Sequence, residues 1–161
     1  GDLPLNLQVS SSGKLVAVCN NGQSKQKVQL FDPKTERLLD EKTIGKSWYG
    51  LKFSRNEKML YVSGGNDNII LTYPIANKKL GKPDTLSLGK AWPKEKIGPA
   101  GIALNESKHL LYTVTKEDNS LYIFNLKSRL MVSKTSLGHE AYSCLLSANK
   151  KVLLPITIDK I

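Results

Sequence analysis

Short apolar runs separated by polar turns recur along the whole chain, and the clearest example spans residues 99–126. Its apolar runs, 101–104, Leu110–Thr115 and 121–124, are separated by turns rich in Asn, Asp, Ser, Glu and Lys. Short β-branched and aromatic runs bounded by such turns are typical of antiparallel strands connected in sequence order. The pattern therefore predicts an all-β chain.

The turn that follows the first strand of this unit occurs four times, at 9–15, 53–59, 104–110 and 146–152. A glycine closes each full unit, at Gly45, Gly89 and Gly138. Each full unit then contains four predicted strands. They span 5–9, 15–19, 28–32 and 38–44 in the first unit, 49–53, 59–63, 69–73 and 85–88 in the second, and 101–104, 110–115, 121–125 and 130–137 in the third.

The first two strands of a unit are apolar with little alternation, as expected of strands covered on both faces, whereas the fourth is charged, as expected of an outer edge. Units of about 40–45 residues with four such strands are typical of β-propeller blades. A sandwich or barrel also has many short strands, but would not normally repeat one turn and one closing glycine in fixed register. The sequence thus predicts one domain over 1–161, a β-propeller of four-stranded antiparallel blades, with blade 1 at about 3–45, blade 2 at about 46–89, blade 3 at about 97–138 and the inner half of blade 4 at about 139–161.

About three and a half blades cannot easily close a ring of four to eight. The simplest interpretation is a piece of a larger propeller whose further blades cover both ends, and the alternative is a partner chain that supplies the missing strands. The last half-blade has no partner for its outer edge, and blade 1 has an uncovered apolar face. We expect the isolated chain to aggregate or to pair with another copy, because such surfaces promote association.

The junction between blades 2 and 3 is longer than the others because it contains an additional segment, residues 90–98. In a propeller this segment should share one face with the loops 20–26, 64–68 and 116–120, and loops on a rigid scaffold often bind ligands. The candidate binding residues on this face are Trp92, Lys94, Lys96, Asn21, Asn66, Asp67, Lys116 and Asp118. Trp92 among lysines suits a glycan, a peptide or a neighbouring domain.

The alternative is a longer loop whose Trp92 covers the blade junction. If the segment is instead a binding element, shortening it to a three-residue junction should leave the fold intact and weaken only binding.

The net charge of +10 raises the question of a nucleic-acid or anionic-surface partner. The lysines and arginines on the opposite face predicted for the a–b and c–d turns are not interleaved with aromatic residues, as they are in readers of single-stranded RNA. A solvated lysine face is favoured, and nucleic acid is an unlikely partner. No apolar run approaches the roughly 18 residues of a membrane span.

Motifs for catalysis or cofactor binding are missing from the sequence. There is no GxSxG, Walker, HExxH or GxGxxG motif. Cys19 and Cys144 lie far apart without CxxC spacing, which argues against a zinc site or disulfide scaffold and favours two small buried hydrophobic residues. His109 and His139 each stand alone, and residues 66–68 resemble a hairpin tip that tolerates left-handed backbone. We therefore predict no catalytic residue, no metal and no cofactor in this segment.

The repeat resembles the YVTN-type β-propeller family. Pro99-Ala100-Gly101-Ile102-Ala103 matches the start of the family repeat best, and degenerate copies of its central tetrad occur in register, as in Tyr61-Val62-Ser63-Gly64. Pro155 departs from the pattern, since proline removes a hydrogen-bond donor from an inner strand. Residues 92–102, 115–121 and 141–147 are similar to exported bacterial proteins in which such a propeller precedes an alkaline-phosphatase-like phosphoesterase domain.

This resemblance implies a periplasmic, extracellular or cell-surface location. We expect a non-catalytic binding or scaffolding module of an exported bacterial β-propeller protein, whose loop face is presented to a partner domain, glycan or peptide. The alternatives are a propeller-type lactonase or hydrolase with its site at the central channel, and the propeller part of a phosphoesterase whose catalytic domain lies outside this chain. Acids and histidines clustered on the inner strands would favour the lactonase, and the predicted inner strands have no such cluster.

Overall fold

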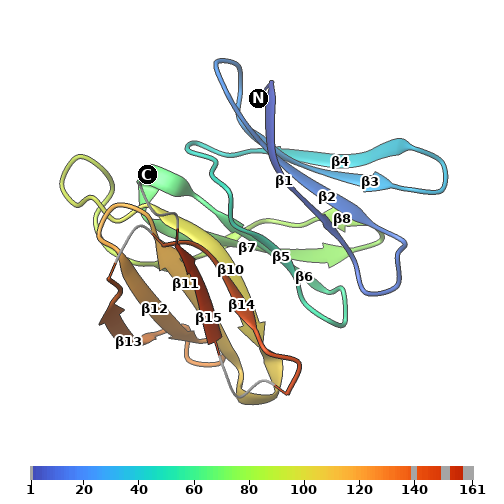
Figure 1. Ribbon diagram of the computed structural model, residues 1–161. Helices are drawn as coiled ribbons and strands as arrows, with labels where there is room; N and C mark the ends of the chain where they lie inside the picture. Colours follow the sequence, from blue (N-terminus) through green and yellow to red (C-terminus); the bar gives the residue numbers. More distant parts are fainter. Residues whose placement is uncertain (1, 139–140, 150–152, 158–161) are drawn as a thin grey trace.

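The computed structural model describes residues 2–138, 141–149 and 153–157, and Figure 1 shows three antiparallel sheets and a hairpin arranged side by side. Blade 1 contains the strands β1 (Leu3–Val9), β2 (Val16–Asn21), β3 (Lys27–Asp32) and β4 (Arg37–Thr43) in this order. Blade 3 contains β10 (Pro99–Asn105), β11 (Leu110–Thr115), β12 (Ser120–Asn125) and β13 (Met131–Ser136). The inner half of blade 4 is the hairpin β14 (Ala141–Leu146) and β15 (Leu153–Thr157). The predicted β-propeller architecture is confirmed.

Blade 2 differs from its neighbours in having five strands. They are β5 (Leu51–Phe53), β6 (Met59–Ser63), β7 (Ile69–Ala76), β8 (Lys79–Leu80) and β9 (Asp84–Ser87). The third strand continues beyond Tyr73, where it was expected to end, and β8 was not predicted, so the expected four strands of this blade are incomplete. The far end of β7 turns back through Asn77 and Lys78, both with positive φ, to pair with β8, whereas β9 pairs with the first half of β7.

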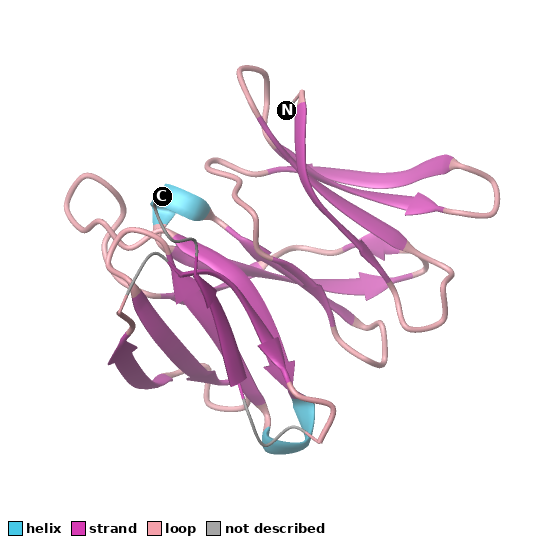
Figure 2. Cartoon of the chain, in the orientation of Figure 1, coloured by secondary structure: helices cyan, strands magenta, loops and turns pink. Residues whose placement is uncertain are grey.

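Regular secondary structure other than strands is limited, among the described residues, to two single-turn 3-10 helices, η1 (Gly65–Asp67) and η2 (Glu106–Lys108), shown in cyan in Figure 2. No helix of the described chain is long and apolar enough to cross a membrane.

Burial follows the predicted inner-to-outer order within a blade. Six of the seven residues of β10 are buried, because blades 2 and 4 pack on its two faces, while β13 at the outer edge is mostly exposed. Gly101 on β10 permits this close approach, since a Cβ there would lie 2.5 Å from the Cα of Ser143 in blade 4. The strand β1 departs from the expected two-sided burial because no described blade packs on its outer side, which leaves Leu7 and Val9 more than half exposed.

Three apolar clusters hold the blades together. The first joins blades 1 and 2 and includes Cys19, Leu30, Leu60 and Tyr73, the second joins blades 2 and 3, and the third lies between blade 3 and the hairpin of blade 4. The junction of blades 1 and 2 is also joined at its outer rim by β8. There Leu80 is buried and donates its N–H to Asp40 at 2.8 Å, and the Lys78 ammonium pairs with Asp32 at 2.8 Å.

Both cysteines are free thiols buried in these clusters, as predicted. Burial raises the pKa of Cys19 to about 11 and that of Cys144 to about 12, from an ordinary value of 9.0. The folded chain therefore keeps both protons at pH values where the unfolded chain loses them. The resulting contribution to stability is complete below pH 9.0 and is lost as the pH rises towards the folded values.

We expect neither thiol to react with a maleimide at pH 8 while the chain is folded, because the thiolate is the nucleophile and both sulfurs are buried. Adding denaturant should expose both, and mass spectrometry should then show two additions. Rapid labelling of Cys144 alone in native buffer would contradict the close packing of blade 4 on blade 3.

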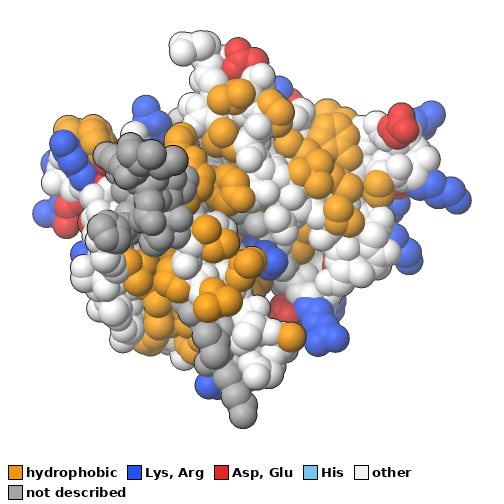
Figure 3. Space-filling model, in the orientation of Figure 1, with side chains coloured by type: hydrophobic (Ala, Val, Ile, Leu, Met, Phe, Trp, Pro, Cys, Tyr) orange, Lys and Arg blue, Asp and Glu red, His pale blue; other side chains and the backbone are white. Residues whose placement is uncertain are grey.

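Two apolar surfaces face away from the described blades. The surface on blade 1 includes Leu7, Val9 and Leu38. Figure 3 shows apolar side chains in orange over this part of the molecule. On the hairpin of blade 4, Leu145 and Leu154 lie opposite one another in the strand register and are 55% and 54% exposed. These two surfaces, called the open faces below, confirm that the structure is a partial propeller.

Candidate binding face

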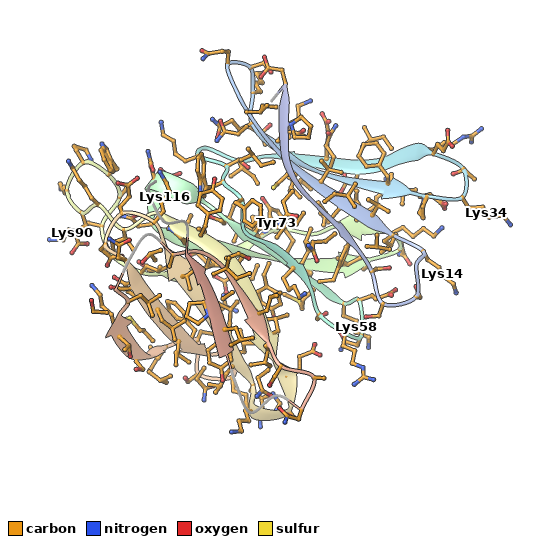
Figure 4. All side chains as sticks on the ribbon, in the orientation of Figure 1. Lys14, Lys34, Lys58, Tyr73, Lys90 and Lys116 are labelled. Atoms are coloured by element: carbon orange, nitrogen blue, oxygen red, sulfur yellow. The ribbon has the colours of Figure 1, made fainter. Side chains whose placement is uncertain are left out.

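The loops that connect β2 to β3, β6 to β7 and β11 to β12 lie at one end of the blades, as predicted. Figure 4 shows Lys90 and Lys116 at this end and Lys14, Lys34 and Lys58 at the opposite end. We call the end with Lys90 and Lys116 the loop face. Of the lysines assigned to the opposite face, Lys150 and Lys151 lie outside the described residues, as does His139.

Residues 90–98 form a loop that is fixed by one buried side chain, Asn68. The Asn68 amide donates to the backbone oxygens of Lys90 at 2.6 Å and Glu95 at 2.8 Å, and its oxygen accepts from the N–H of Gly98 at 3.0 Å. Asn68 is fully buried and has the left-handed backbone expected of the 66–68 tip, with φ of 56°. One bond is fully buried and the other two are partly buried, so the Asn68 side chain anchors this loop at three points.

Further backbone bonds join the loop to both neighbouring blades. The N–H of Trp92 donates to Asn66 at 2.9 Å, and the N–H groups of Lys116 and Glu117 donate to Gly98 and Ile97 at 3.0 and 3.1 Å. Ile97 is buried in the cluster between blades 2 and 3. The loop therefore has a structural stem and an exposed tip.

The tip bears Trp92, Lys94 and Lys96, all three exposed. The Trp92 side chain is 39% exposed, and the Lys96 ammonium lies 4.8 Å from its ring centroid. Ile97, and not Trp92, covers the blade junction. This finding argues against the alternative in which the tryptophan is only a cover for that junction.

The expectation that residues 90–98 could be shortened without affecting the fold needs correction. Shortening would remove the three partners of the Asn68 side chain and the buried Ile97 side chain. Buried polar groups without partners and empty core space both destabilise a fold. Substitution of the tip, rather than deletion of the loop, separates binding from stability.

Next to this loop lies a pocket of about 260 Å³ formed by loops of all three full blades. Its lining residues are Asn21, Gln26, Lys46, Ser47, Trp48, Gly65, Asn66 and Lys116. We call it the loop-face pocket. The Lys116 ammonium lies 4.5 Å from the Trp48 ring centroid and pairs with Glu117 at 2.6 Å.

The wall of the pocket formed by blade 1 is a hydrogen-bonded amide network. Asn21 donates its amide N–H to the Ser47 carbonyl at 2.6 Å and accepts from Gln26 at 3.3 Å, while Gln26 also accepts from the Ser47 N–H. Two polar atoms of lining residues remain without a partner, Ser47 Oγ and Trp48 Nε1, and both are buried. The pocket thus has ordered walls, and two unpaired hydrogen-bond donors are buried within them.

The structure brings together only some of the eight candidate binding residues predicted from sequence. Asn21, Asn66 and Lys116 line the pocket, whereas Trp92, Lys94 and Lys96 form the loop tip beside it. Asp67 is half-buried in η1, with a carboxyl oxygen 3.0 Å from where a Cβ on Gly45 would lie. Four residues of the pocket were not among the predicted candidates: Gln26, Lys46, Ser47 and Trp48. The Lys46-Ser47-Trp48 run in the blade 1 to blade 2 junction was the available signal, since it pairs a lysine with one of only two tryptophans.

Asp118 belongs to a network inside blade 3 and does not line the pocket. One of its oxygens accepts from the Thr115 hydroxyl, and the other accepts from the Tyr122 hydroxyl at 2.7 Å and the Lys134 ammonium at 2.9 Å. Hydrogen bonds to Tyr122 and Asp118 raise the pKa of Lys134, and burial raises the pKa of Tyr122. This network links β11, β12 and β13, so Asp118 stabilises the blade.

On the opposite face, a wider groove of about 500 Å³ lies between blades 2 and 3, lined in part by Arg55, Glu106 and His109. His109 has positive φ in the β10–β11 turn, in agreement with its predicted place in a turn. Within residues 2–138, 141–149 and 153–157, no three His, Cys, Asp or Glu side chains are grouped so that they could hold a metal ion.

No family model and no curated protein sequence matches the chain. Among solved structures, hydrazine synthase from Kuenenia stuttgartiensis is similar with a TM-score of 0.79 and 17% identity, covering 98% of this chain and 43% of its own. A functionally unknown protein from Desulfotomaculum acetoxidans has a TM-score of 0.76 and 9% identity, covering 96% of this chain and 49% of its own. The WD40 repeats of RRP9 have a TM-score of 0.69 and 15% identity, covering 89% and 42%.

These identities show the fold alone, which is that of β-propeller and WD40 proteins. The chain spans less than half the length of each of these structures.

Proposed function

We propose that this chain is a non-catalytic binding or scaffolding module of an exported bacterial β-propeller protein, and that its loop face binds a partner domain, a glycan or a peptide. The observation that supports this proposal most strongly is the exposed Trp92 on a loop fixed by the buried Asn68. A large aromatic side chain on a rigid loop binds with little loss of conformational freedom, and tryptophan is enriched among residues that dominate binding energy.

The charge around Trp92 narrows the range of partners. Lys94 and Lys96 are exposed on the same tip, and Lys116 lies in the adjacent pocket. An aromatic ring beside ammonium groups suits a partner with a flat or apolar surface next to acidic groups. A peptide segment or a sugar with an acidic substituent has both properties.

We further propose that additional propeller blades cover the two open faces in the parent protein. This is supported by the exposed apolar side chains at the two ends, Leu7 and Val9 at one and Leu145 and Leu154 at the other. It is also supported by length, since the chain covers only 43% and 49% of two similar structures. Following the family resemblance, the parent protein would act at the periplasm or cell surface. The propeller would there orient a second domain, which the same resemblance suggests is a phosphoesterase.

The test uses a phage-displayed peptide library and a glycan array as probes. Ligands selected on the wild-type chain should bind the Trp92→Ala variant at least about tenfold more weakly, since losing a central tryptophan commonly costs 2 kcal/mol or more. The midpoint of thermal unfolding should stay close to the wild-type value, because the tip is exposed.

Leu130→Ala is the matched control, because Leu130 is an exposed large apolar residue, at 67%, next to the outer strand β13. It should bind like the wild type. Unchanged binding of Trp92→Ala, or equal loss in both variants, would show that the loop tip is not the binding site.

A further inference from the structure

We infer that the loop-face pocket binds a carboxylate group, presented by an acidic side chain of a peptide. This inference rests on the proposed role of the loop face in binding, and it identifies the chemistry of the group that the face selects. The two features that support it are an imbalance of charge in the lining and two buried donors without acceptors.

The first feature is the charge of the lining. Two of the eight lining residues, Lys46 and Lys116, are cationic, and none is acidic. Glu117 pairs with Lys116 at the edge of the pocket and fixes its ammonium over the Trp48 ring. An ammonium group has three donor protons, so Lys116 can still donate to a bound anion. Lys46 is exposed and is in no ion pair described for this chain, so its charge is not neutralised locally.

The second feature is the pair of unused donors. Ser47 is only 2% exposed, and its Oγ has no partner, although the residue lines the pocket. Trp48 Nε1 is likewise buried without a partner. Both groups donate hydrogen bonds, and the indole N–H can only donate. Neither atom is open to the pocket in the free chain, so a ligand reaches them only if the Ser47 hydroxyl or the Trp48 ring shifts. Buried donors are normally paired in folded proteins, and an acceptor that reached them would satisfy a requirement that the free chain leaves unmet.

The size and the donor types select among anions. A volume of about 260 Å³ is below the range of about 300–1,000 Å³ typical of small-molecule sites, and it suits a single side-chain group. Phosphate sites commonly use arginine forks or successive backbone N–H groups, and this lining contains no arginine. A carboxylate carries one charge and accepts readily from ammonium, hydroxyl and indole groups. The pocket therefore fits a glutamate or aspartate side chain better than a phosphate.

The test follows the indole N–H signals by nuclear magnetic resonance in the intact 161-residue chain. The chain has only two tryptophans, and the Trp92→Phe variant assigns the two signals. The probes are a pentapeptide with a central Glu and blocked ends, the same peptide with Gln, and inorganic phosphate. We expect the Glu peptide to shift the Trp48 signal saturably, with an affinity at least about tenfold higher than that of the Gln peptide or phosphate.

Two variants test whether the Lys46 ammonium and the Ser47 hydroxyl bind the carboxylate. Lys46→Met should weaken the Glu peptide about tenfold, whereas Lys34→Met, an exposed lysine at the opposite end, should have no effect. Ser47→Ala should also weaken binding without lowering the midpoint of thermal unfolding, because its hydroxyl has no partner to lose. A purely structural role for Ser47 would instead lower that midpoint.

Equal shifts with the Glu and Gln peptides would overturn the inference, as would a response to phosphate alone or an equal effect of Lys46→Met and Lys34→Met. If the Glu peptide leaves Trp48 unaffected while Trp92→Ala loses its selected ligands, the carboxylate inference fails and the proposed function stands. If Trp48 responds while Trp92→Ala keeps its ligands, the pocket is a site and the loop tip is not.

Discussion

Replacing Asn68 by alanine should lower the free energy of unfolding by about 3–5 kcal/mol, because its buried side chain makes three hydrogen bonds to residues 90–98 that are lost together. Each buried group left unpaired costs roughly 1–3 kcal/mol, and alanine tolerates the left-handed backbone poorly. For a chain of this size, the midpoint of thermal unfolding should fall by roughly 10 °C or more. Circular dichroism melting curves would measure it.

Asn77 provides the matched control for the backbone contribution. It has a φ of 51°, close to that of Asn68, but its side chain is exposed in the β7–β8 turn. Asn77→Ala should cost only about 1 kcal/mol. Asn68→Gly, which is free of the backbone penalty, should remain strongly destabilised. Similar melting points for Asn68→Ala and Asn77→Ala would show that the hydrogen bonds to the loop contribute little.

The isolated 161-residue chain should self-associate, and lysines placed on the open faces should reverse this. Leu145 and Leu154 lie opposite one another on the hairpin of blade 4, and Leu7 lies on the far side of blade 1. Large apolar surfaces and unpaired strand edges promote association in water. In analytical ultracentrifugation, the wild type should sediment as dimers or larger species at micromolar concentration, and Leu7→Lys combined with Leu145→Lys should sediment mainly as a monomer.

Thr35→Lys combined with Ser24→Lys adds the same two charges at exposed turns, outside the strands that form the open faces, and should leave the association unchanged. If the wild-type chain sediments as a stable, folded monomer at high concentration, the open faces are not surfaces that further blades cover. If the two turn lysines and the two open-face lysines abolish self-association equally, net charge rather than the open faces is the cause.

Much of the fold could be predicted from sequence because each strand is a local pattern. The boundaries of β6 and β11 were predicted correctly, since a turn rich in polar residues precedes each apolar run. The strand β8 was missed because two residues give no periodic signal, and its stability depends on blade 1 through the buried Leu80 and its bond to Asp40. That contact joins residues 40 positions apart, beyond any local pattern.

The candidate binding face was predicted less completely than the fold. The repeat placed Asn21, Asn66 and Lys116 on one face, and the structure brings all three to one pocket. The buried state of Asn68 could not be predicted, because an asparagine in a turn looks the same whether its amide faces water or a neighbouring loop. Asp118 was misleading for the same reason: the sequence shows its charge, but not the Tyr122 and Lys134 groups that use it.

The contacts between the β7–β8 hairpin and blade 1 affect which parts of the chain unfold together. The Leu80 N–H and the Lys78 ammonium of blade 2 bind the Asp40 and Asp32 carboxylates of blade 1. The outer rims of these blades therefore cannot separate without losing a hydrogen bond and an ion pair. No such strand joins blade 2 to blade 3 in the described chain, where the outer rim is bridged by the partly exposed pair of Arg129 and Asp84. In native-state hydrogen exchange, the amides of blades 1 and 2 should therefore open as one cooperative unit, with blade 3 opening separately and at lower free energy.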